Sequence, residues 1–593
     1  MVRNGAGMHV ATTSRAHVTK AGEQRLYQSH LLRRTFREDG KVKHQTLANL
    51  TPLPTEQLDL LRRSLNGETF VAADSVAVTV ERSLPHGDVA LVMAQARALG
   101  LPALLGPAGR QRDLALALIV SRVVRPGTKL ATVTWWGDTT LGVDLGVADT
   151  STDDAYAAMD WLLGRQDSIE AKLARRHLLD ETTNPHRMAL FDLSSSWMEG
   201  QHCSLAARGY SRDGKKGKPQ IEYGLLTDPA GRPVGVRVFP GNTGDPTAFV
   251  EAVTVVRNKF RLRNMVMVGD RGMITKARID QLKELPAADG FAWLTCLRAP
   301  QIAALAADGG PLQMSLFDQQ DLAEISHPDY PGERLVACRN PALADQRTRK
   351  RQDLLVCTEQ LLNKITTRVA NGTLTGEDRI GVAVGKVIDK YKVGKHFTLH
   401  IGQTTFSYQR DQARINAEAA LDGIYVIRTS MTADKLDTAT VVTAYKNLSH
   451  LERDWRNLKV DDLDLRPIHH RLADRVKAHI LICMLAEYLV WHLRRALAPL
   501  TYTDEQPPTR ANPVAPAQRS TAATHKASRR RDEHDQPYHS FRGLLAHMAT
   551  LTRNELRYGK KTTDPVIPTL AIPTRTQHRA FDLIGATIPV ALA

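Results

Sequence analysis

Cysteine is scarce in this chain of 593 residues, and its pattern excludes two classes of protein. The five cysteines are an odd number and include no C-x-x-C pair: Cys203, Cys296, Cys338, Cys357 and Cys483. Neither a disulfide framework nor a zinc ribbon has this pattern, so we expect reduced thiols. His202 beside Cys203 is a single pair of ligand types, and a zinc site needs a second pair.

Long hydrophobic runs are also lacking, because no uncharged apolar stretch reaches the length of about 18 residues that crosses a bilayer. The most apolar segment, Ala478 to Trp491, contains Glu487, and we predict a buried helix there. The first residues include Arg, His and Lys but no apolar stretch typical of a signal peptide. We therefore expect a cytoplasmic protein with no membrane partner.

Acidic residues are fewer than basic residues in this chain. The chain has 63 Asp and Glu against 79 Lys and Arg, a formal net charge of +16. A basic excess favours a polyanionic partner, and nucleic acid is the commonest one, although a basic tail that aids solubility gives the same excess. A chain of 593 residues with 42% hydrophobic residues exceeds a single hydrophobic core, so we expect several domains.

The first 185 residues divide into three regions. Residues 1–22 are polar and irregular, which predicts a disordered arm. Residues 23–84 contain two strand-like runs on either side of Asp39-Gly40, and Asp-Gly between such runs is a hairpin signal. Residues 85–185 have the periodicity of short helices joined by basic loops, and Ser151 is placed to cap one of them.

From residue 186 strands and helices alternate, which predicts a mixed α/β domain, parallel and antiparallel, over residues 186–297. The expected strands are 188–191, 221–226, 234–239, 265–268 and 291–297, and the expected helices are 246–259 and 275–284. The pattern resumes over residues 423–500 with a strand at 424–428 and helices at 438–458 and 470–497.

Residues 298–422 interrupt this domain. Strand-like runs at 334–338, 353–357 and 397–401 predict a β-rich insertion, with a charged helix-like middle over 346–369. After the domain, residues 501–540 are rich in Pro, Thr, Arg and Asp, which predicts a flexible basic linker. Residues 541–593 are expected to form a short helix and an irregular tail.

Two acids follow apolar strands in similar contexts. Asp192 comes after Met188–Phe191, and Asp270 comes after Met265–Val268 and lies between Gly269 and Gly272. Carboxylates at the carboxyl ends of neighbouring strands project toward one site. A strand-end Asp is also a common turn former, so the residues alone leave a structural and a functional role open.

A third acid, Glu452, lies on the helix predicted over 438–458. At 100° per residue, Tyr445, Glu452 and Lys459 fall on one face, and Arg456 shares that face. Three carboxylates without cysteine suit Mg²⁺, and two such ions activate a hydroxyl and stabilise the leaving oxygen of a phosphodiester. An exposed helix with an i,i+4 pair between Glu452 and Arg456 would give the same pattern.

This helix resembles the Y-x2-R-x3-E-x6-K signature of bacterial insertion-sequence transposases that have an RNase H-like DDE core. Tyr445, Glu452 and Lys459 match in identity and spacing, whereas Leu448 stands where the signature has Arg. Arg456 is the substitute that we consider for the phosphate contact of that Arg.

Further blocks are similar to the same family in the family's order, over roughly residues 24 to 500. They are Leu190–Ser195, Gly209–Asp213, Gly241–Asp245, Val268–Met273 and Arg466–His479. The long separation of Asp270 from Glu452 matches the family's habit of inserting a β-rich module before the last acid.

The resemblance implies a magnesium-dependent DNA transposase with an RNase H-like mixed sheet flanked by helices. It would cleave at the terminal inverted repeats of an insertion sequence and join the freed 3′-hydroxyl to target DNA. Asp192, Asp270 and Glu452 would be the catalytic residues and the ligands of two Mg²⁺ ions, for which Mn²⁺ substitutes.

The resemblance also implies the DNA contacts. Tyr445, Lys459, Arg456 and Arg271 would bind DNA phosphates, and the helical region 85–185 would bind the transposon ends. Two protomers would bring two double-stranded ends together as a homodimer.

Three other functions compete with this one. A structure-selective nuclease of the RNase H-like class would cut without joining. A domesticated DNA-binding protein would keep the fold and lose the chemistry. A serine recombinase would use Ser194, Ser195 or Ser196, but the accompanying basic residues are missing, and we expect these serines to cap a turn.

Overall fold

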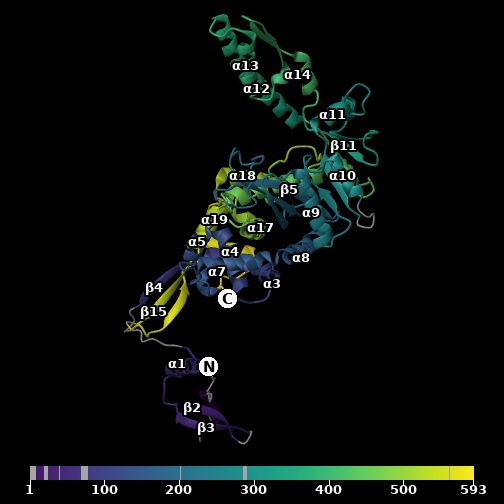
Figure 1. The fold of residues 1–593 in the computed structure, drawn as a ribbon. Coiled ribbons are helices and arrows are strands. Elements are labelled where there is room, and N and C mark those ends of the chain that lie inside the picture. Colours follow the sequence, from purple (N-terminus) through teal and green to yellow (C-terminus); the bar gives the residue numbers. More distant parts are fainter. Residues whose placement is uncertain are drawn as a thin grey trace. The chain divides into compact units, whose positions relative to one another are not determined.

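The structure is a computed structural model that describes residues 8–18, 24–38, 41–68, 78–200, 202–284, 290–559 and 561–592 (Figure 1). The chain forms two compact units. The first comprises residues 1–83 and 554–569, and the second comprises residues 84–553 and 570–593.

The first unit opens with an antiparallel sheet of β1 (Met8–Val18), β2 (Gln24–Glu38) and β3 (Lys41–Asn49), followed by α1 (Thr55–Leu65). The pairing of β2 with β3 confirms the predicted hairpin strands, while Asp39-Gly40 lies outside the described residues. The prediction of a disordered arm over residues 1–22 is wrong for Met8–Val18, because β1 pairs with β2 along its whole length. This segment includes Val and Thr, whose β-branched side chains favour strands.

A second sheet joins the two ends of the sequence, with the order β16-β15-β4. It consists of β4 (Val78–Pro85), β15 (Thr552–Tyr558) and β16 (Val566–Leu570). Arg557 on β15 donates to Glu81 on β4 at 2.6 Å. The expected irregular tail is therefore wrong, because residues distant in sequence complete this sheet.

The second unit contains the predicted helical region. Its helices are α2 (Gly87–Ala98), α3 (Leu101–Leu105), α4 (Arg110–Val124), α5 (Lys129–Trp136), α6 (Thr140–Asp144), α7 (Thr152–Leu163) and α8 (Gln166–Leu178). Ser151 caps α7 through a reciprocal capping box with Asp154, as the sequence predicts.

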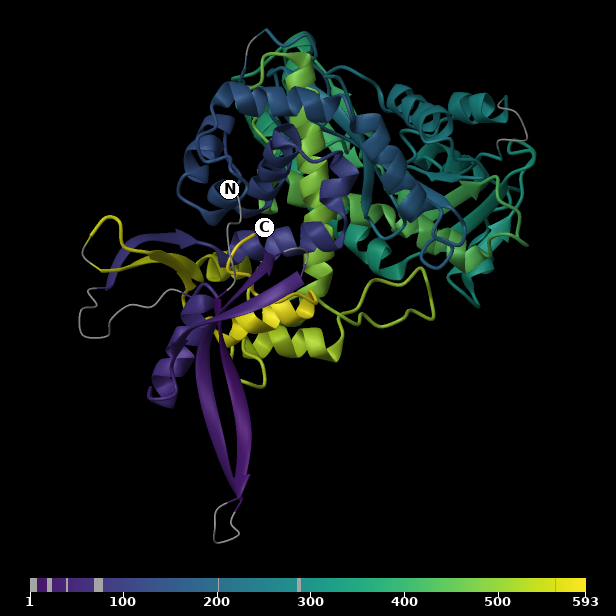
Figure 2. The same cartoon turned by 90° about the horizontal axis from the view of Figure 1, so that it is seen from below.

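The predicted apolar helix is α17 (Ala473–Ala496), which packs against α2, α4, α7 and β7. It is long and apolar enough to span a membrane, but 89% of its most apolar 18-residue window is buried inside the fold. Figure 2 shows this helix running among the α-helices of the second unit. Ala478 to Trp491 is thus a core helix, as predicted.

The central sheet of the second unit has eight strands in the order β10-β11-β14-β9-β8-β5-β6-β7. The five strands that match the predicted α/β domain are β5 (Met188–Trp197), β6 (Gln220–Thr227), β7 (Pro233–Pro240), β8 (Val266–Val268) and β9 (Ala292–Cys296). β5, β6 and β7 are antiparallel, whereas β5, β8 and β9 are parallel. The mixed α/β prediction is confirmed.

Helices connect these strands where the sequence predicts them. α9 (Asp245–Thr254) continues as a π-helical turn, η2 (Val255–Lys259), and α10 (Lys276–Lys283) leads toward β9. After β14 (Ile424–Thr429), the predicted helix is divided into α15 (Thr438–Lys446), α16 (Leu448–Arg456) and the π-helical turn η6 (Asn457–Asp461).

The interruption is mainly helical, and the expectation of a β-rich insertion is wrong. β10 (Leu322–Ile325) and β11 (Arg334–Arg339) extend the central sheet beyond β14. Residues 353–357, expected to be a strand, lie inside α12 (Pro341–Ala370). The remaining elements are α11 (Ala299–Leu305), η4 (Met314–Phe317), α13 (Glu377–Ile388), η5 (Gly394–His396), the hairpin β12 (Phe397–Ile401) and β13 (Phe406–Arg410), and α14 (Gln412–Ala419).

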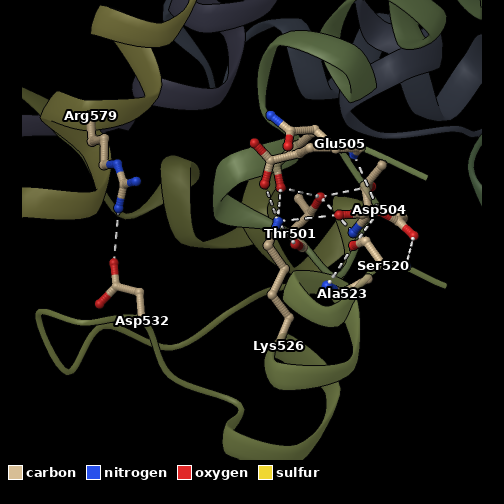
Figure 3. A network of polar contacts seen from close by, with 11 residues as sticks. Thr501, Asp504, Glu505, Ser520, Ala523, Lys526, Asp532 and Arg579 are labelled. Carbon is tan, nitrogen blue, oxygen red and sulfur yellow. Dashed lines mark hydrogen bonds and ion pairs between the residues drawn. The ribbon is translucent and has the colours of Figure 1, made fainter. Parts of the chain in front are cut away.

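Residues 501–540 are also more ordered than the predicted flexible linker. They follow η7 (Ala498–Leu500), contain α18 (Thr521–Arg529), and precede α19 (Phe541–Ala549), while α20 (Arg575–Leu583) lies near the chain end. The buried Lys526 donates to three backbone carbonyls and pairs with Glu505, and Asp504 accepts from Ser520 (Figure 3). Polar residues that satisfy one another gave the segment its linker-like composition.

Candidate active site

Asp192 lies within β5, and Asp270 lies two residues beyond the end of the adjacent parallel strand β8. Leu190 on β5 pairs with Val268 on β8, and each aspartate follows two residues later. The two carboxylates are near enough for the charge of Asp270 to act on Asp192. This register supports the prediction that the two acids lie at one edge of the sheet. However, β5 does not end at Asp192. It continues to Trp197 because β6 pairs with it there.

The carboxyl of Asp192 is held in an environment that disfavours its charge. Burial raises its pKa to about 6, and the nearby Asp270 carboxylate acts in the same direction. The indole N–H of Trp455 donates to Asp192 Oδ2 at 2.9 Å, which, like the positive charge of Arg212, opposes that shift. A partly buried acid beside a second acid is a place where a cation would be stabilised.

Asp270 is exposed and uses one of its two oxygens. Its Oδ1 accepts the Arg271 backbone N–H at 2.7 Å and the Tyr445 hydroxyl at 3.4 Å. A β-carbon added to Gly272 would lie 3.3 Å from Asp245 Oδ2 and 3.9 Å from Asp270 Oδ2. Glycine at 272 therefore leaves space between two carboxylates.

Glu452 lies between the two residues that reach the aspartates. Tyr445, seven residues earlier, donates to Asp270, and Trp455, three residues later, donates to Asp192. Glu452 itself is exposed on α16 and forms no hydrogen bond or ion pair with any described residue. Within the described part of the chain, no three His, Cys, Asp or Glu side chains meet closely enough to hold a metal ion.

The four predicted phosphate-binding residues have different surroundings. Tyr445 is half-buried beside Asp270, and burial raises the pKa of its hydroxyl. Arg271 and Arg456 are exposed. Lys459 is largely buried and donates to Asp213 Oδ1 at 3.0 Å, so in this structure its charge is already paired.

Leu448, which replaces the arginine of the signature, has a packing role. It is the first residue of α16 and packs, half-buried, against the large hydrophobic core of the second unit. An arginine there would have to extend its charged end past this apolar contact.

A polar network beside Asp192 is not predicted from the sequence. The backbone N–H of Arg212 donates to Ser195 Oγ at 3.1 Å, and its guanidinium pairs with Asp245 and with Glu222, the latter at 3.4 Å. Burial raises the pKa of Glu222 to about 7, and the charge of Arg212 opposes this. Arg212 and Asp245 lie in the family-like blocks Gly209–Asp213 and Gly241–Asp245, for which the sequence alone indicates no role.

The prediction that the three serines after Asp192 cap a turn is wrong. They lie inside β5, where Ser195 accepts from Arg212 and Ser196 Oγ shares a 2.6 Å hydrogen bond with the Tyr223 hydroxyl. Alternation along a strand and burial on both faces explain their position better than a turn does.

Comparison with known families gives two matches. A model described as the IS1634 family transposase N-terminal domain matches residues 17–74, and a model described as the transposase DDE domain matches residues 196–489. The second range includes Asp270 and Glu452 and begins four residues after Asp192.

Comparison with individual proteins adds little. No curated protein matches the chain. Among solved structures, a piggyBac transposase synaptic complex with hairpin DNA has 9% sequence identity and a TM-score of 0.30, over 78% of this chain and 76% of that chain. A similarity at this level supports no argument about the site.

Proposed function

The chain belongs to the insertion-sequence transposases of the DDE class, and within that class we propose that Asp192, Asp270 and Glu452 are its catalytic residues. As a DDE transposase it is a DNA-binding enzyme that cleaves and transfers phosphodiester bonds with the help of divalent metal ions. The observation that supports the assignment best is the register of β5 and β8, because Asp192 and Asp270 each follow a paired residue of these adjacent strands by two positions.

We propose that the core is RNase H-like. The strand order β7-β6-β5-β8-β9, with three antiparallel strands followed by two parallel ones, supports this arrangement. In such a sheet the first strand is central, so an acid on β5 has the acid of β8 as its neighbour. β14, β11 and β10 extend this sheet and precede the helices that bear Glu452.

The carboxylates fit a pair of Mg²⁺ ions, with Mn²⁺ as a substitute. Carboxylate oxygens are the ligands that Mg²⁺ prefers, and Asp270 Oδ2 has no hydrogen bond from any described residue. When bound, the ions would activate the attacking hydroxyl and stabilise the leaving oxygen. Glu452, which does not meet the two aspartates closely in this structure, would join the ligand set when the ions are bound.

The protein groups around the acids would position them and the DNA. Trp455 holds Asp192 through its indole N–H, and Tyr445 holds Asp270 through its hydroxyl. Tyr445, Arg271, Arg456 and Lys459 would bind the phosphates on either side of the scissile bond. Lys459 would exchange its present partner, Asp213, for a phosphate oxygen.

The reaction proposed is cleavage at the terminal inverted repeats of an insertion sequence, followed by attack of the freed 3′-hydroxyl on target DNA. We propose that two protomers hold two ends, that residues 85–185 contribute to end binding, and that the protein acts in the cytoplasm. The excess of 16 positive charges would favour association with DNA.

The test uses duplexes that end in the inverted repeat of the element. Asp192→Asn and Asp270→Asn should each abolish magnesium-dependent cleavage and leave binding to the repeat largely intact. Near-normal cleavage by either variant would disprove the assignment. Strand joining measured with pre-cut ends separates transposition from nuclease activity, because a nuclease would cut the same duplex and join nothing.

A further inference from the structure

A cationic cavity lies between the helical region and the segment that follows η6. Its volume is about 540 Å³, and its walls come from α4, the start of α5, residues 464–472 and the start of α17. The basic residues that line it include Arg122, Lys129, Arg466, Arg471 and Arg475. The one acid among the lining residues, Asp464, is paired with Arg542 at 3.1 Å.

Lys129 is the unusual member of this group. It is 95% buried, since only 5% of its surface is exposed, yet it lines the cavity and its ammonium has no hydrogen bond or ion pair with any described residue. Arg122 is equally buried, and its guanidinium donates to the backbone carbonyls of Gly127 and Leu463. Because Arg122 is also a cation, it does not neutralise Lys129. A buried unpaired ammonium is costly unless an anion comes to it.

A second cation at the cavity has an unsatisfied N–H group. The Nε of Arg475 has no hydrogen-bond partner among the described residues, and its guanidinium lies 4.1 Å from the ring of Tyr156. Burial first, and then the charges of Lys129 and Arg122, lower the pKa of His470 to about 3 and that of His479 well below its usual value, so both imidazoles are neutral. The arginines that line the cavity, together with the ionised fraction of Lys129, would attract an anion.

Two helices also begin at this cavity. α5 starts at Lys129 with Thr128 as its N-cap, and α17 starts after Leu472, and all three residues line the space. The first backbone N–H groups of a helix point outward along its axis and favour an anion. Asp474, in the first turn of α17, pairs with Lys477 and does not line the cavity.

We infer that this cavity binds a backbone phosphate of the DNA, with Lys129 as its central ligand. The inference rests on the DNA binding of the transposase family but not on the proposed catalytic residues. DNA is favoured over a free anion because Arg466, in the wall, pairs with Asp213, which also accepts from Lys459 of the candidate active site. The exposed Arg471 and His469 border the same cavity.

The principal test compares Lys129→Met with Lys477→Met in the full chain. Both variants replace a lysine by an apolar side chain, but Lys477 is outside the cavity. Burial first, and then the charge of Arg122, lower the pKa of Lys129 to about 7, and a bound phosphate would favour its ionised form. We expect Lys129→Met to weaken binding of a terminal-repeat duplex about tenfold. It should also reduce the slope of log affinity against log salt by about one, whereas Lys477→Met should leave that slope unchanged.

Thermal unfolding of the DNA-free protein separates a ligand site from a structural lysine. Lys129→Met should unfold at a higher temperature than the wild type, because a buried unpaired charge has been removed. Sodium phosphate, compared with sodium chloride at equal ionic strength, should raise the unfolding temperature of the wild type and not that of Lys129→Met. Lower stability of Lys129→Met would overturn the inference.

A variant at the exposed border of the cavity provides a test that does not depend on a substitution in the core. Arg471→Gln, at the exposed border, should also reduce the salt slope. If phosphate stabilises the wild type through Lys129 but neither variant changes DNA binding, the cavity takes free phosphate and the DNA assignment is overturned. None of these measurements involves cleavage, so their outcome does not depend on whether Asp192 and Asp270 are catalytic.

Discussion

At the scale of single residues, the function proposed for Asp192 conflicts with stability. Its pKa is raised from 3.8 to about 6, mainly by burial, so the folded protein disfavours the ionised form that a metal ligand needs. Each pKa unit corresponds to about 1.4 kcal/mol. The carboxyl is neutral in both states well below pH 3.8, and the cost grows as the pH rises through 3.8 to about 6.

Asp192→Asn should therefore stabilise the metal-free protein at pH 7 while it abolishes cleavage. We expect a gain of about 1–2 kcal/mol, below the full value for two pKa units because the side chain is partly exposed. The measurement is thermal or denaturant unfolding of both proteins at pH 7 and at pH 4, and the gain should be several times smaller at pH 4, close to the pKa of the unfolded carboxyl. Equal stability at pH 7 would contradict the burial argument.

Trp455 offers a second test at this scale. Trp455→Phe removes the N–H donor to Asp192 Oδ2 but keeps an aromatic ring in the core. Because this hydrogen bond lowers the pKa of Asp192, its loss should raise that pKa further. The acidic limb of the pH–rate profile for cleavage should then move to higher pH, with activity recovering above pH 8. An unshifted limb would show that Trp455 does not act through Asp192.

The sequence identified Asp192, Asp270 and Tyr445 but not their partners. Strand ends and helical spacing are local patterns, so they are visible in one sequence. The contacts of Trp455 with Asp192, and of Arg212 with Glu222 and Asp245, join segments far apart in the chain. No periodicity reports such contacts, although the family-like blocks contain three of these residues, Asp192, Arg212 and Asp245.

At the scale of elements, α16 combines an exposed side, for which we propose DNA contacts, with a core-facing side. Arg456 and Arg453 are both exposed, but only Arg456 shares the face of Glu452. Arg456→Gln should lower DNA affinity and reduce the salt slope by about one, and Arg453→Gln is the matched control. Leu448→Arg in the Arg456→Gln background should restore part of the affinity. Equal effects of Arg453→Gln would show that the face of the helix does not matter.

The core-facing side of α16 contains a buried acid pair with α17. Asp454 and Glu487 are each 1% exposed, and Asn457 donates to Glu487 at 3.1 Å. Burial, and for Glu487 also the charge of Asp454, raises both pKa values well above their usual range, so the folded protein binds protons that the unfolded chain releases. Stability from this pair is present at acidic pH and is lost as the pH rises.

Glu487→Gln should consequently stabilise the protein above neutral pH by about 1–3 kcal/mol, with a smaller effect at pH 5. Unfolding measured at the two pH values checks this. The exposed Glu251→Gln removes an equal charge and should change little. Destabilisation of Glu487→Gln at pH 8 would mean that the ionised carboxylate has a role in the fold.

Elements with clear periodicity were predicted well, and short apolar runs were not. Four of the five strands of the core and the helices between them lie within one residue of their predicted bounds, whereas β5 continues six residues beyond its predicted end. The run at 353–357 is apolar and β-branched enough to suggest a strand, but it is a single stretch of the 30-residue helix α12. A run of five residues does not distinguish period 2 from period 3.6.

At the scale of the whole molecule, the sequence revealed the order of its parts but not the links between distant ones. The sheet of β4, β15 and β16 joins residues about 480 positions apart, and the order of residues 501–540 depends on contacts such as Lys526 with Glu505. Composition describes a segment alone, so it predicted a linker where tertiary contacts fix the chain.

The central claim is that three acids from two strands and a helix form one metal site. Glu452 is the member whose role depends most on spacing and motif, so its substitution is the most direct measurement. Cleavage of a terminal-repeat duplex at saturating Mg²⁺ should fall by about a hundredfold or more in Glu452→Gln, because loss even of groups that only orient a metal ligand costs up to that much. Binding of the duplex, and cleavage by the neighbouring Arg453→Gln, should stay near wild type. Near-normal cleavage by Glu452→Gln would contradict the account.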